Sequence, residues 1–359
     1  HKMYFVGGCV RNELLGAQVS DLDVSTDATP AQVLSITKGA GLRAIPTGVE
    51  HGTVTVVVND IPFEVTTFRK DIETDGRRAV VAFSKSIEDD AKRRDFTMNA
   101  LYADRNGDVI DPVEGIPDLQ NRRVRFIDDA EQRIKEDYLR ILRFFRFHAW
   151  YGDASEGLDE EGFAACAAHV DGLDGLSKER VGQELKKLLA APDPSPAMAS
   201  MAACGALLRI LPGAEPSALA ILIHIELKAE LPPDPICRLA VIGGADPVGH
   251  LRLSKAENRL LDTYLSGATP LELGYRHPDS AVSILSIRAA AIGSEISPTD
   301  LEDARLGEGK SFPVKAGDLM PAIQGPDLGK ALSILEDRWI MSRFKLTKEA
   351  LIAGYDIQE

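Results

Sequence analysis

The residue pattern changes character about a third of the way along the chain, and this change limits the folds open to it. Before residue 120, short apolar segments with the alternation of strands are separated by turns. From Glu131 onward, apolar residues recur at helical spacing, interrupted by glycine and proline. We therefore predict an α+β fold: a small head with a mixed sheet and helices, then an all-α neck, body and tail. We place the head at 1–120, the neck at 121–191, and the body and tail at 192–359.

Several segments are predicted as individual elements. Strands are expected at Met3–Val6, Asp21–Val24, Thr53–Val58 and Phe63–Phe68, with a turn at Asn59–Asp60 between the last two. Helices are expected at Arg11–Leu15, Ile134–Trp150 and Glu179–Leu189. The proline-rich segment 191–196 is the clearest candidate for a hinge between helical units.

Length and composition set the class of protein. The 359 residues are too many for one ordinary core, and 44% hydrophobic with 27% charged residues is typical of a soluble globular protein. No apolar run approaches the ~20 residues needed to cross a bilayer, and no secretory signal is evident. The four cysteines are scattered without a CxxC pair, which fits a reducing compartment. We expect a cytoplasmic protein that does not associate with membranes.

The net charge of −14 does not favour nucleic-acid binding by the overall field. An RNA partner would need local basic surface, and candidate clusters are Arg122, Arg123 and Arg125; Lys186 and Lys187; and Arg338, Arg343, Lys345 and Lys348. Taken singly, each cluster is more typical of a solvated helix or loop face than of an RNA-binding surface.

Two features of the first third carry chemistry. Gly7-Gly8 follows a strand and precedes a helix with Arg11, an arrangement suited to phosphate because backbone N–H groups and a forked guanidinium meet there. Asp21 and Asp23 are two apart on an expected strand, so both carboxylates should project from one face. Such a pair suits Mg²⁺, and Glu64 on the strand Phe63–Phe68 is a candidate third acid. Glycine turns and exposed acidic strands are also common without such a function.

Together these residues resemble a known family. Gly7-Gly8-Cys9-Val10-Arg11 followed by Asp21-Leu22-Asp23 resembles the signature of the tRNA nucleotidyltransferase and bacterial poly(A) polymerase family, class II of the polymerase-β-like nucleotidyltransferases. Further matching motifs occur in the expected order: His51–Val54, Thr74–Arg78, Arg93–Ala100, Asp111-Pro112, Glu136–Phe147 and Ser177–Arg180. The motifs cover the first half of the chain, and the second half resembles the family more loosely.

The resemblance implies roles for individual residues. The Gly7-Gly8 turn and Arg11 would contact a nucleoside triphosphate, and Asp21 and Asp23 would hold catalytic metals. The motif Arg93–Ala100 would contribute two further candidate nucleotide contacts, Arg94 and Asn99. The helix matching Glu136–Phe147 would select the incoming base.

The spacing in this helix supports the last role. Asp137, Arg140, Arg143 and Arg146 recur every three residues and so keep to one broad helix face. The residues between them are apolar and should pack on the opposite side: Leu139, Ile141, Leu142, Phe144, Phe145 and Phe147. A carboxylate can accept from the exocyclic amine of cytosine or adenine while a guanidinium donates to the ring.

The expected activity is template-independent addition of CCA to the tRNA 3′ end from CTP and ATP, by two-metal phosphoryl transfer with release of pyrophosphate. The partners implied are the acceptor arm of tRNA, CTP, ATP and Mg²⁺, with no protein partner evident. A poly(A) polymerase, a CC-only or A-only enzyme, and a non-catalytic RNA-binding module are the alternatives. Intact Asp21 and Asp23 argue against the last. Partial activity would depend on a flexible loop near 70–83, and Asn12 stands where the family commonly has an aspartate.

Overall fold

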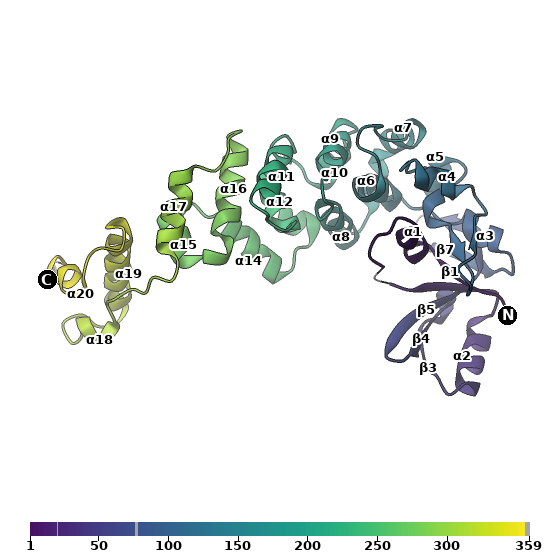
Figure 1. Cartoon of the computed structure of the whole chain (residues 1–359), viewed down its shortest axis with the longest axis horizontal. Coiled ribbons are helices and arrows are strands. Elements are labelled where there is room, and N and C mark those ends of the chain that lie inside the picture. The colour runs from purple at the N-terminus through teal and green to yellow at the C-terminus, as the bar shows by residue number, and fades with distance from the viewer. Residues whose placement is uncertain (20, 76–77, 356–359) are drawn as a thin grey trace. The chain divides into compact units, whose positions relative to one another are not determined.

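The computed structural model describes residues 1–19, 21–75 and 78–355 (Figure 1). The chain divides into two compact units, the first made of His1–Ala214 with Ala245–Arg252 and the second of Glu215–Gly244 with Leu253–Glu359. The predicted α+β fold is confirmed, with strands confined to the first unit among the described residues. The predicted boundaries at 120 and 191 stay a prediction.

One mixed sheet organises the start of the first unit. Seven of the described strands form it, in the order β3 (Arg43–Gly48), β4 (Thr53–Val58), β5 (Ile61–Thr67), β2 (Asp23–Thr26), β1 (Met3–Val6), β8 (Tyr102–Ala103) and β9 (Val109–Ile110). β2 and β5 run parallel, and the other pairs are antiparallel. The predicted strands Met3–Val6 and Thr53–Val58 are confirmed. The predicted turn is confirmed as well, since Asn59 and Asp60 both adopt left-handed φ angles of 49° and 65°.

The helix α2 (Pro30–Gly39) packs against this sheet, and the contact is a small apolar core (Figure 1). Its buried members are Val24, Ala28, Val33, Val54, Val56 and Val65. Thr29 caps α2 by accepting from the N–H of Gln32. A separate hairpin consists of β6 (Arg69–Asp75) and β7 (Arg78–Phe83). The tip of the loop predicted near 70–83, Gly76 and Arg77, lies outside the described residues.

The strand predicted at Asp21–Val24 begins later than expected, because β2 starts at Asp23. β1 ends at Val6, where Gly7 turns the chain away with a φ of 74°. No β1 residue therefore pairs with Asp21, and the carbonyl of Leu22 instead accepts from the N–H of Glu64 at 3.3 Å.

Most α-helices described in the first unit come after β7 in the chain. They are α3 (Ile87–Lys92), α4 (Gly115–Gln120), α5 (Ala130–Glu136), α6 (Leu139–Tyr151), α7 (Glu160–Ala168), α8 (Lys178–Leu189), α9 (Ser195–Ala203), α10 (Ala206–Ile210) and α13 (Pro247–Leu251). The segment 191–196 links α8 to α9 inside the first unit.

The continuous helix predicted at Ile134–Trp150 is wrong, because the chain breaks between α5 and α6. Asp137 is extended, with φ −155° and ψ 104°, and its carboxylate accepts from the N–H of Leu139 at 3.1 Å. An aspartate competes with the backbone in this way at helix starts. All six of the apolar α6 side chains named above are buried, as predicted, but Phe147 does not lie opposite the charged residues, because the guanidinium groups of Arg143 and Arg146 pack over its ring. Phe96 and Phe126 pack against Phe144 and Phe147, which fixes α6 on the sheet-bearing part of the unit.

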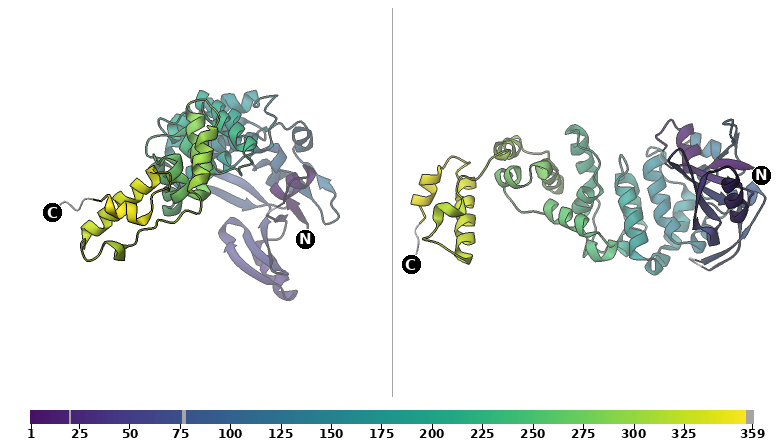
Figure 2. Two further views of the ribbon diagram at one scale, coloured as in Figure 1. Left: turned by 60° about the vertical axis from the view of Figure 1, so that its left-hand side comes forward. Right: turned by 90° about the horizontal axis from the view of Figure 1, so that it is seen from below.

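The second unit is helical throughout its described residues (Figure 2). Its α-helices are α11 (Leu219–Lys228), α12 (Pro235–Ile242), α14 (Lys255–Tyr264), α15 (Pro270–Arg276), α16 (Ala281–Ala291), α17 (Pro298–Gly307), α18 (Ala316–Leu319), α19 (Pro326–Met341) and α20 (Lys348–Ala353). A buried ion pair joins Arg238 to Glu226 at 2.7 Å. No helix in the described ranges is both long and apolar enough to cross a membrane.

Candidate functional site

The turn after β1 brings the backbone at Gly7 close to Arg94 and Asn99. Gly7 has a φ of 74°, which favours glycine, and its N–H donates to the carbonyl of Leu101 at 3.0 Å. A Cβ added at Gly7 would lie 3.3 Å from Nη1 of Arg94 and 3.5 Å from the carbonyl oxygen of Asn99. Gly7 therefore lets the backbone approach Arg94 and Asn99, and Gly8 then begins α1 (Gly8–Leu14), three residues before the predicted start.

Acidic side chains gather beside this turn. Asp23 on β2 lies opposite Glu64 on β5 in the parallel ladder. Burial raises the pKa of Asp23, the charge of Glu64 raises it further, and Asp21 adds to the effect while Arg94 opposes it. The three predicted acids are therefore close enough to interact, although only Asp23 and Glu64 lie on strands. Among the described residues, no three His, Cys, Asp or Glu side chains form a preassembled metal-binding group.

Arg94 connects the acids to the turn. Its guanidinium contacts Asp90 at 3.2 Å and donates to Ser25, two residues beyond Asp23, at 3.3 Å. Burial by itself would lower the pKa of Arg94, but the neighbouring Asp90 outweighs it and the pKa is raised. Arg94 therefore stays charged beside Asp23 and Gly7.

Arg11 is the most buried of the predicted nucleotide-binding cations, with 5% of its surface exposed. It donates to the side-chain oxygen of Asn99, to that of Asn12 at 2.9 Å, and to the hydroxyl of Tyr151 at 2.8 Å. Its Cζ lies 3.9 Å from the centre of the Tyr151 ring. Burial lowers the pKa of Arg11; Tyr151 and the charge of Asp95 oppose this effect, and the charges of Arg146 and Arg143 add to it.

A hydrogen-bonded chain runs from Arg11 to the arginines of α6. Asn99 donates to Asp95 at 2.9 Å, and Asp95 accepts from Nε of Arg143 at 2.7 Å. Burial would raise the pKa of Asp95, but Arg143 and Asn99 outweigh it and lower the pKa to about 2. Asp95 is thus a fixed negative charge between Asn99 and Arg143.

The aromatic ring of Phe147 lies beneath three guanidinium groups. The Cζ atoms of Arg11, Arg143 and Arg146 are 5.2, 5.3 and 4.7 Å from its centre. Nε of Arg146 is 2.6 Å from the carboxylate of Glu184 on α8. Three cations and the two carboxylates Asp95 and Glu184 leave this cluster with a net positive charge, which suits an anionic ligand.

The predicted row of four charges on one helix face needs correction. Asp137 precedes α6, and its carboxylate pairs with Arg180 at 2.6 Å. Arg140 pairs with Glu136 at 2.5 Å and donates to the carbonyl of Arg93 at 3.3 Å. Asp137 is therefore held by the break between two helices and by α8, so its position depends on contacts distant in sequence.

Four residues of this network received no role in the sequence analysis: Asp95, Tyr151, Arg180 and Glu184. Asp95 and Arg180 lie within quoted motifs, and Tyr151 lies one helical turn after Phe147, on the side of α6 that carries Arg143 and Arg146. Glu184 on α8 carries the charge opposite to the arginines of α6, and this complementarity was the signal available for it. Helical spacing beyond Phe147 was the signal available for Tyr151.

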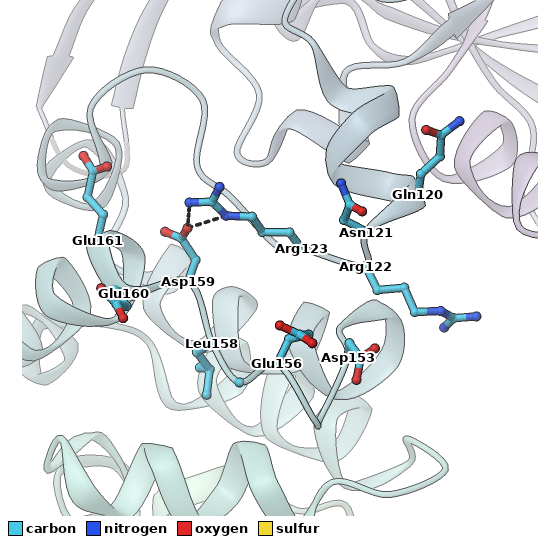
Figure 3. Close-up of a pocket in the computed structure, with 11 residues that line it drawn as sticks. Gln120, Asn121, Arg122, Arg123, Asp153, Glu156, Leu158, Asp159, Glu160 and Glu161 are labelled. Atoms are coloured by element: carbon cyan, nitrogen blue, oxygen red, sulfur yellow. Dashed lines mark hydrogen bonds and ion pairs between the residues drawn. The ribbon is translucent and has the colours of Figure 1, made fainter.

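A separate polar cavity of about 890 Å³ lies between the end of α4 and the start of α7 (Figure 3). Arg123 donates to Asp159 at its wall, at 2.8 Å from Nε, and Asp159 caps α7 through the N–H of Gly162. Arg122 and Arg123 of one candidate basic cluster line this cavity, but none of the predicted catalytic or nucleotide-binding residues does. This cavity, although large, is therefore separate from the candidate catalytic site.

Comparison with known proteins connects this geometry to a family. Residues 3–125 match the poly A polymerase head domain, and residues 157–217 match the probable RNA and SrmB-binding site of polymerase A. The chain is 44% identical over 190 residues to the mitochondrial CCA tRNA nucleotidyltransferase 1 of Mus musculus, covering 53% of this chain and 44% of that protein. It is 43% identical over 208 residues to a CCA-adding enzyme of Streptococcus pyogenes, covering 57% of this chain and 50% of that protein. The chain spans about half the length of the curated relatives it matches.

Solved structures match over nearly the whole chain. The Bacillus stearothermophilus CCA-adding enzyme in complex with CTP aligns with a TM-score of 0.72 at 27% identity, covering 98% of this chain and 91% of that one. The Thermotoga maritima CCA-adding enzyme complexed with tRNA aligns with a TM-score of 0.69 at 17% identity, covering 98% and 90%, and supports the fold. The order of motifs, the head-domain match and these alignments agree, and the chain belongs to the tRNA nucleotidyltransferase and bacterial poly(A) polymerase family.

Proposed function

We propose that this chain adds CCA to the 3′ end of tRNA from CTP and ATP without a template, with release of pyrophosphate. The observation that carries the proposal is the meeting, at the Gly7 turn, of the acidic pair Asp23 and Glu64 with the partly buried cation Arg94. Acids for metals and cations for phosphates are the two requirements of phosphoryl transfer. The names of the relatives support tRNA as the substrate.

The donor set fits a divalent cation. Burial raises the pKa of Asp23, the negative charges of Glu64 and Asp21 raise it further, and a cation bound beside them would offset both effects. Asp21 and Asp23 would hold the metal, with Glu64 as a third acid, and Mg²⁺ suits carboxylates completed by water and phosphate. When bound, the metal supplies charge neutralisation at the reacting phosphate and lowers the pKa of the attacking hydroxyl.

The chain's own residues bind and orient the triphosphate. Arg11 and Arg94 contribute fixed positive charge on either side of Asn99, and the start of α1 at Gly8 presents backbone N–H groups. These groups are held in place before a nucleotide arrives, so little reorganisation is needed when the phosphates bind. Catalysis is then mostly positioning and charge stabilisation.

Base selection rests on Asp137 and Arg140. Asp137 keeps acceptor capacity after bonding to Leu139 and Arg180, because a carboxylate has about four lone-pair sites. It accepts from the exocyclic amine that cytosine and adenine share and that uracil lacks, while Arg140 donates to the ring. Arg143 and Arg146 complete the nucleotide site as fixed cations near the base-selecting pair. C and A are thus chosen by protein groups alone.

The helical part contacts tRNA through shape and backbone, since an A-form helix offers little sequence to side chains. Residues 157–217 are the first candidates for this role because they match an RNA-binding family segment. We place the protein in the cytoplasm on the grounds of its scattered cysteines.

The test is a gel extension assay on a tRNA transcript without its CCA end, with CTP alone, ATP alone, and both, in the presence of Mg²⁺. Growth by two nucleotides with CTP and by three with both, on tRNA and not on an unstructured oligonucleotide, supports the proposal. A long ladder with ATP on any RNA would instead identify a poly(A) polymerase. A stop after two nucleotides, or a need for a CC end, would identify a partial enzyme.

A further inference from the structure

We propose that Tyr151 is a positioning residue that holds Arg11 for the triphosphate of the incoming nucleotide. This inference rests on the proposed function, and it assigns a role to a side chain outside the motifs that carry the family resemblance. Tyr151 is the last residue of α6, and 140 positions separate it from Arg11.

Tyr151 contacts Arg11 in two ways at once. Its hydroxyl accepts from Nη2 of Arg11 at 2.8 Å, and its ring lies under the guanidinium with Cζ 3.9 Å from the ring centre. The ring is itself supported by Phe147, whose centre is 5.4 Å away. Two contacts from one rigid side chain fix both the position and the plane of the guanidinium.

The other partners of Arg11 are neutral. Asn12 and Asn99 accept from it through side-chain amide oxygens. Asp95, whose charge acts on Arg11 from a distance, accepts its hydrogen bonds from Asn99, Arg143 and the backbone N–H of Phe96. Within the described part of the chain, no carboxylate lies at ion-pair distance from Arg11.

This environment has a consequence for anion binding. A buried guanidinium normally pairs with a carboxylate, which neutralises its charge. Here an aromatic face and neutral oxygens orient Arg11 and leave its positive charge uncompensated. Asn12, at the position where the resemblance implies an aspartate, contributes to the same result. A phosphate group reaching Arg11 therefore meets a fixed, full charge.

The role predicts a pattern that a purely structural residue would not give. The triphosphate is common to CTP and ATP, so loss of Tyr151 should weaken the binding of both nucleotides by the same factor. Pyrophosphate binds the same phosphate site, so its inhibition constant should rise by that factor too. The rate at saturating nucleotide should change less than KM.

The experiment compares the wild-type chain with Tyr151→Leu, Tyr151→Phe and the control Trp150→Leu. Trp150 is the preceding residue of α6, and its indole donates to the carbonyl of Lys187, not to Arg11. We expect Tyr151→Leu to raise KM for CTP and for ATP by about tenfold, the size of a lost cation–π contact and hydrogen bond. Tyr151→Phe keeps the ring, so it should recover most of this loss, with KM about threefold above wild type. Trp150→Leu should leave both KM values unchanged.

Three results would overturn the inference: unchanged KM in Tyr151→Leu, a change for one nucleotide and not the other, or a loss confined to kcat. If Tyr151→Leu does not fold, the inhibition constant of pyrophosphate in Tyr151→Phe decides, and a value equal to that of wild type counts against the role. A folded wild type that extends no RNA would overturn the proposed function instead. Calorimetric binding of pyrophosphate to wild type and Tyr151→Phe would then test the positioning of Arg11 by itself, with equal affinities overturning it.

Discussion

Asp23 and Glu64 lie directly opposite each other on the parallel strands β2 and β5, so that two acidic residues are neighbours in the sheet. Burial and then Glu64 raise the pKa of Asp23 above its ordinary value. When the pKa of an acid is higher in the folded than in the unfolded protein, the fold loses stability as pH rises from the unfolded pKa through the folded pKa. Ionised Asp23 therefore destabilises the fold at pH 7.

Asp23→Asn should therefore raise Tm at pH 7, by about 2 °C, even though it removes a proposed metal ligand. The gain should shrink toward pH 4, where the wild-type carboxyl takes up a proton. Adding Mg²⁺ should raise Tm in the wild type more than in the variant. Thermal unfolding at the two pH values checks this, and a lower Tm for Asp23→Asn at pH 7 would contradict it.

Asp95→Asn should destabilise the first unit, because it leaves the partly buried charge of Arg143 beside only the more distant Glu184 at 4.0 Å. We expect a loss of about 3 kcal/mol in the free energy of unfolding at pH 7. The pKa of Asp95 is lowered to about 2, so its contribution is present above the unfolded value and is lost as pH falls toward 2. The difference between wild type and variant should therefore narrow below about pH 4.

Urea unfolding followed by Trp150 fluorescence in a Trp339→Phe background measures this, since Trp150 lies in the first unit and these are the two tryptophans of the chain. A difference that stays constant down to pH 3 would show that the charge of Asp95 is not the cause.

Arg140→Ala should raise misincorporation of UTP and GTP with little loss of stability. Glu136, its partner, keeps a second contact with Arg133 at 2.5 Å, so the buried carboxylate is not stranded. Arg133→Ala is the matched control, because it removes the other partner of the same carboxylate and should leave nucleotide choice unchanged. Single-nucleotide extension of tRNA with each of the four nucleotides is the readout. Equal fidelity in the two variants would remove Arg140 from base selection.

Gly172→Ala should disturb the break that holds Asp137. A Cβ at Gly172 would lie 1.9 Å from Cδ1 of Tyr138, the residue next to Asp137, so the ring must move. We expect a loss of about 2 kcal/mol in unfolding free energy, together with a higher KM for CTP and ATP. Gly175→Ala, in the same 3₁₀ segment, places its Cβ in open space and should change neither. Unaltered kinetics in a destabilised Gly172→Ala would separate Tyr138 from the nucleotide site.

The strands and buried helix positions that depend on local residue patterns were predicted correctly. The β-branched run at Thr53–Val58 became β4, and the apolar positions of α6 are buried, because alternation and helical spacing directly encode which side faces a core. The family resemblance implied Arg94 as a nucleotide contact, and Glu64 was expected beside Asp23 only if their strands shared a sheet, which they do.

The parts that were missed depend on long-range contacts. The break at Asp137 is stabilised by Arg180, 43 residues away, and by Tyr138 packing on Gly172. The sequence around Asp137 reads as continuous helix because neither partner is local. The Tyr151–Arg11 contact likewise joins segments 140 residues apart.

The central claim is that the acids beside the Gly7 turn catalyse nucleotide addition to tRNA. Its most direct test is the extension of a tRNA lacking its CCA end by wild type and Asp23→Asn, at equal concentration and with tRNA binding measured in parallel. We predict that the wild type adds CCA and that Asp23→Asn loses about 10³-fold in rate or more while binding tRNA normally. Addition by Asp23→Asn at the wild-type rate, or no addition by a folded wild type, would contradict the account.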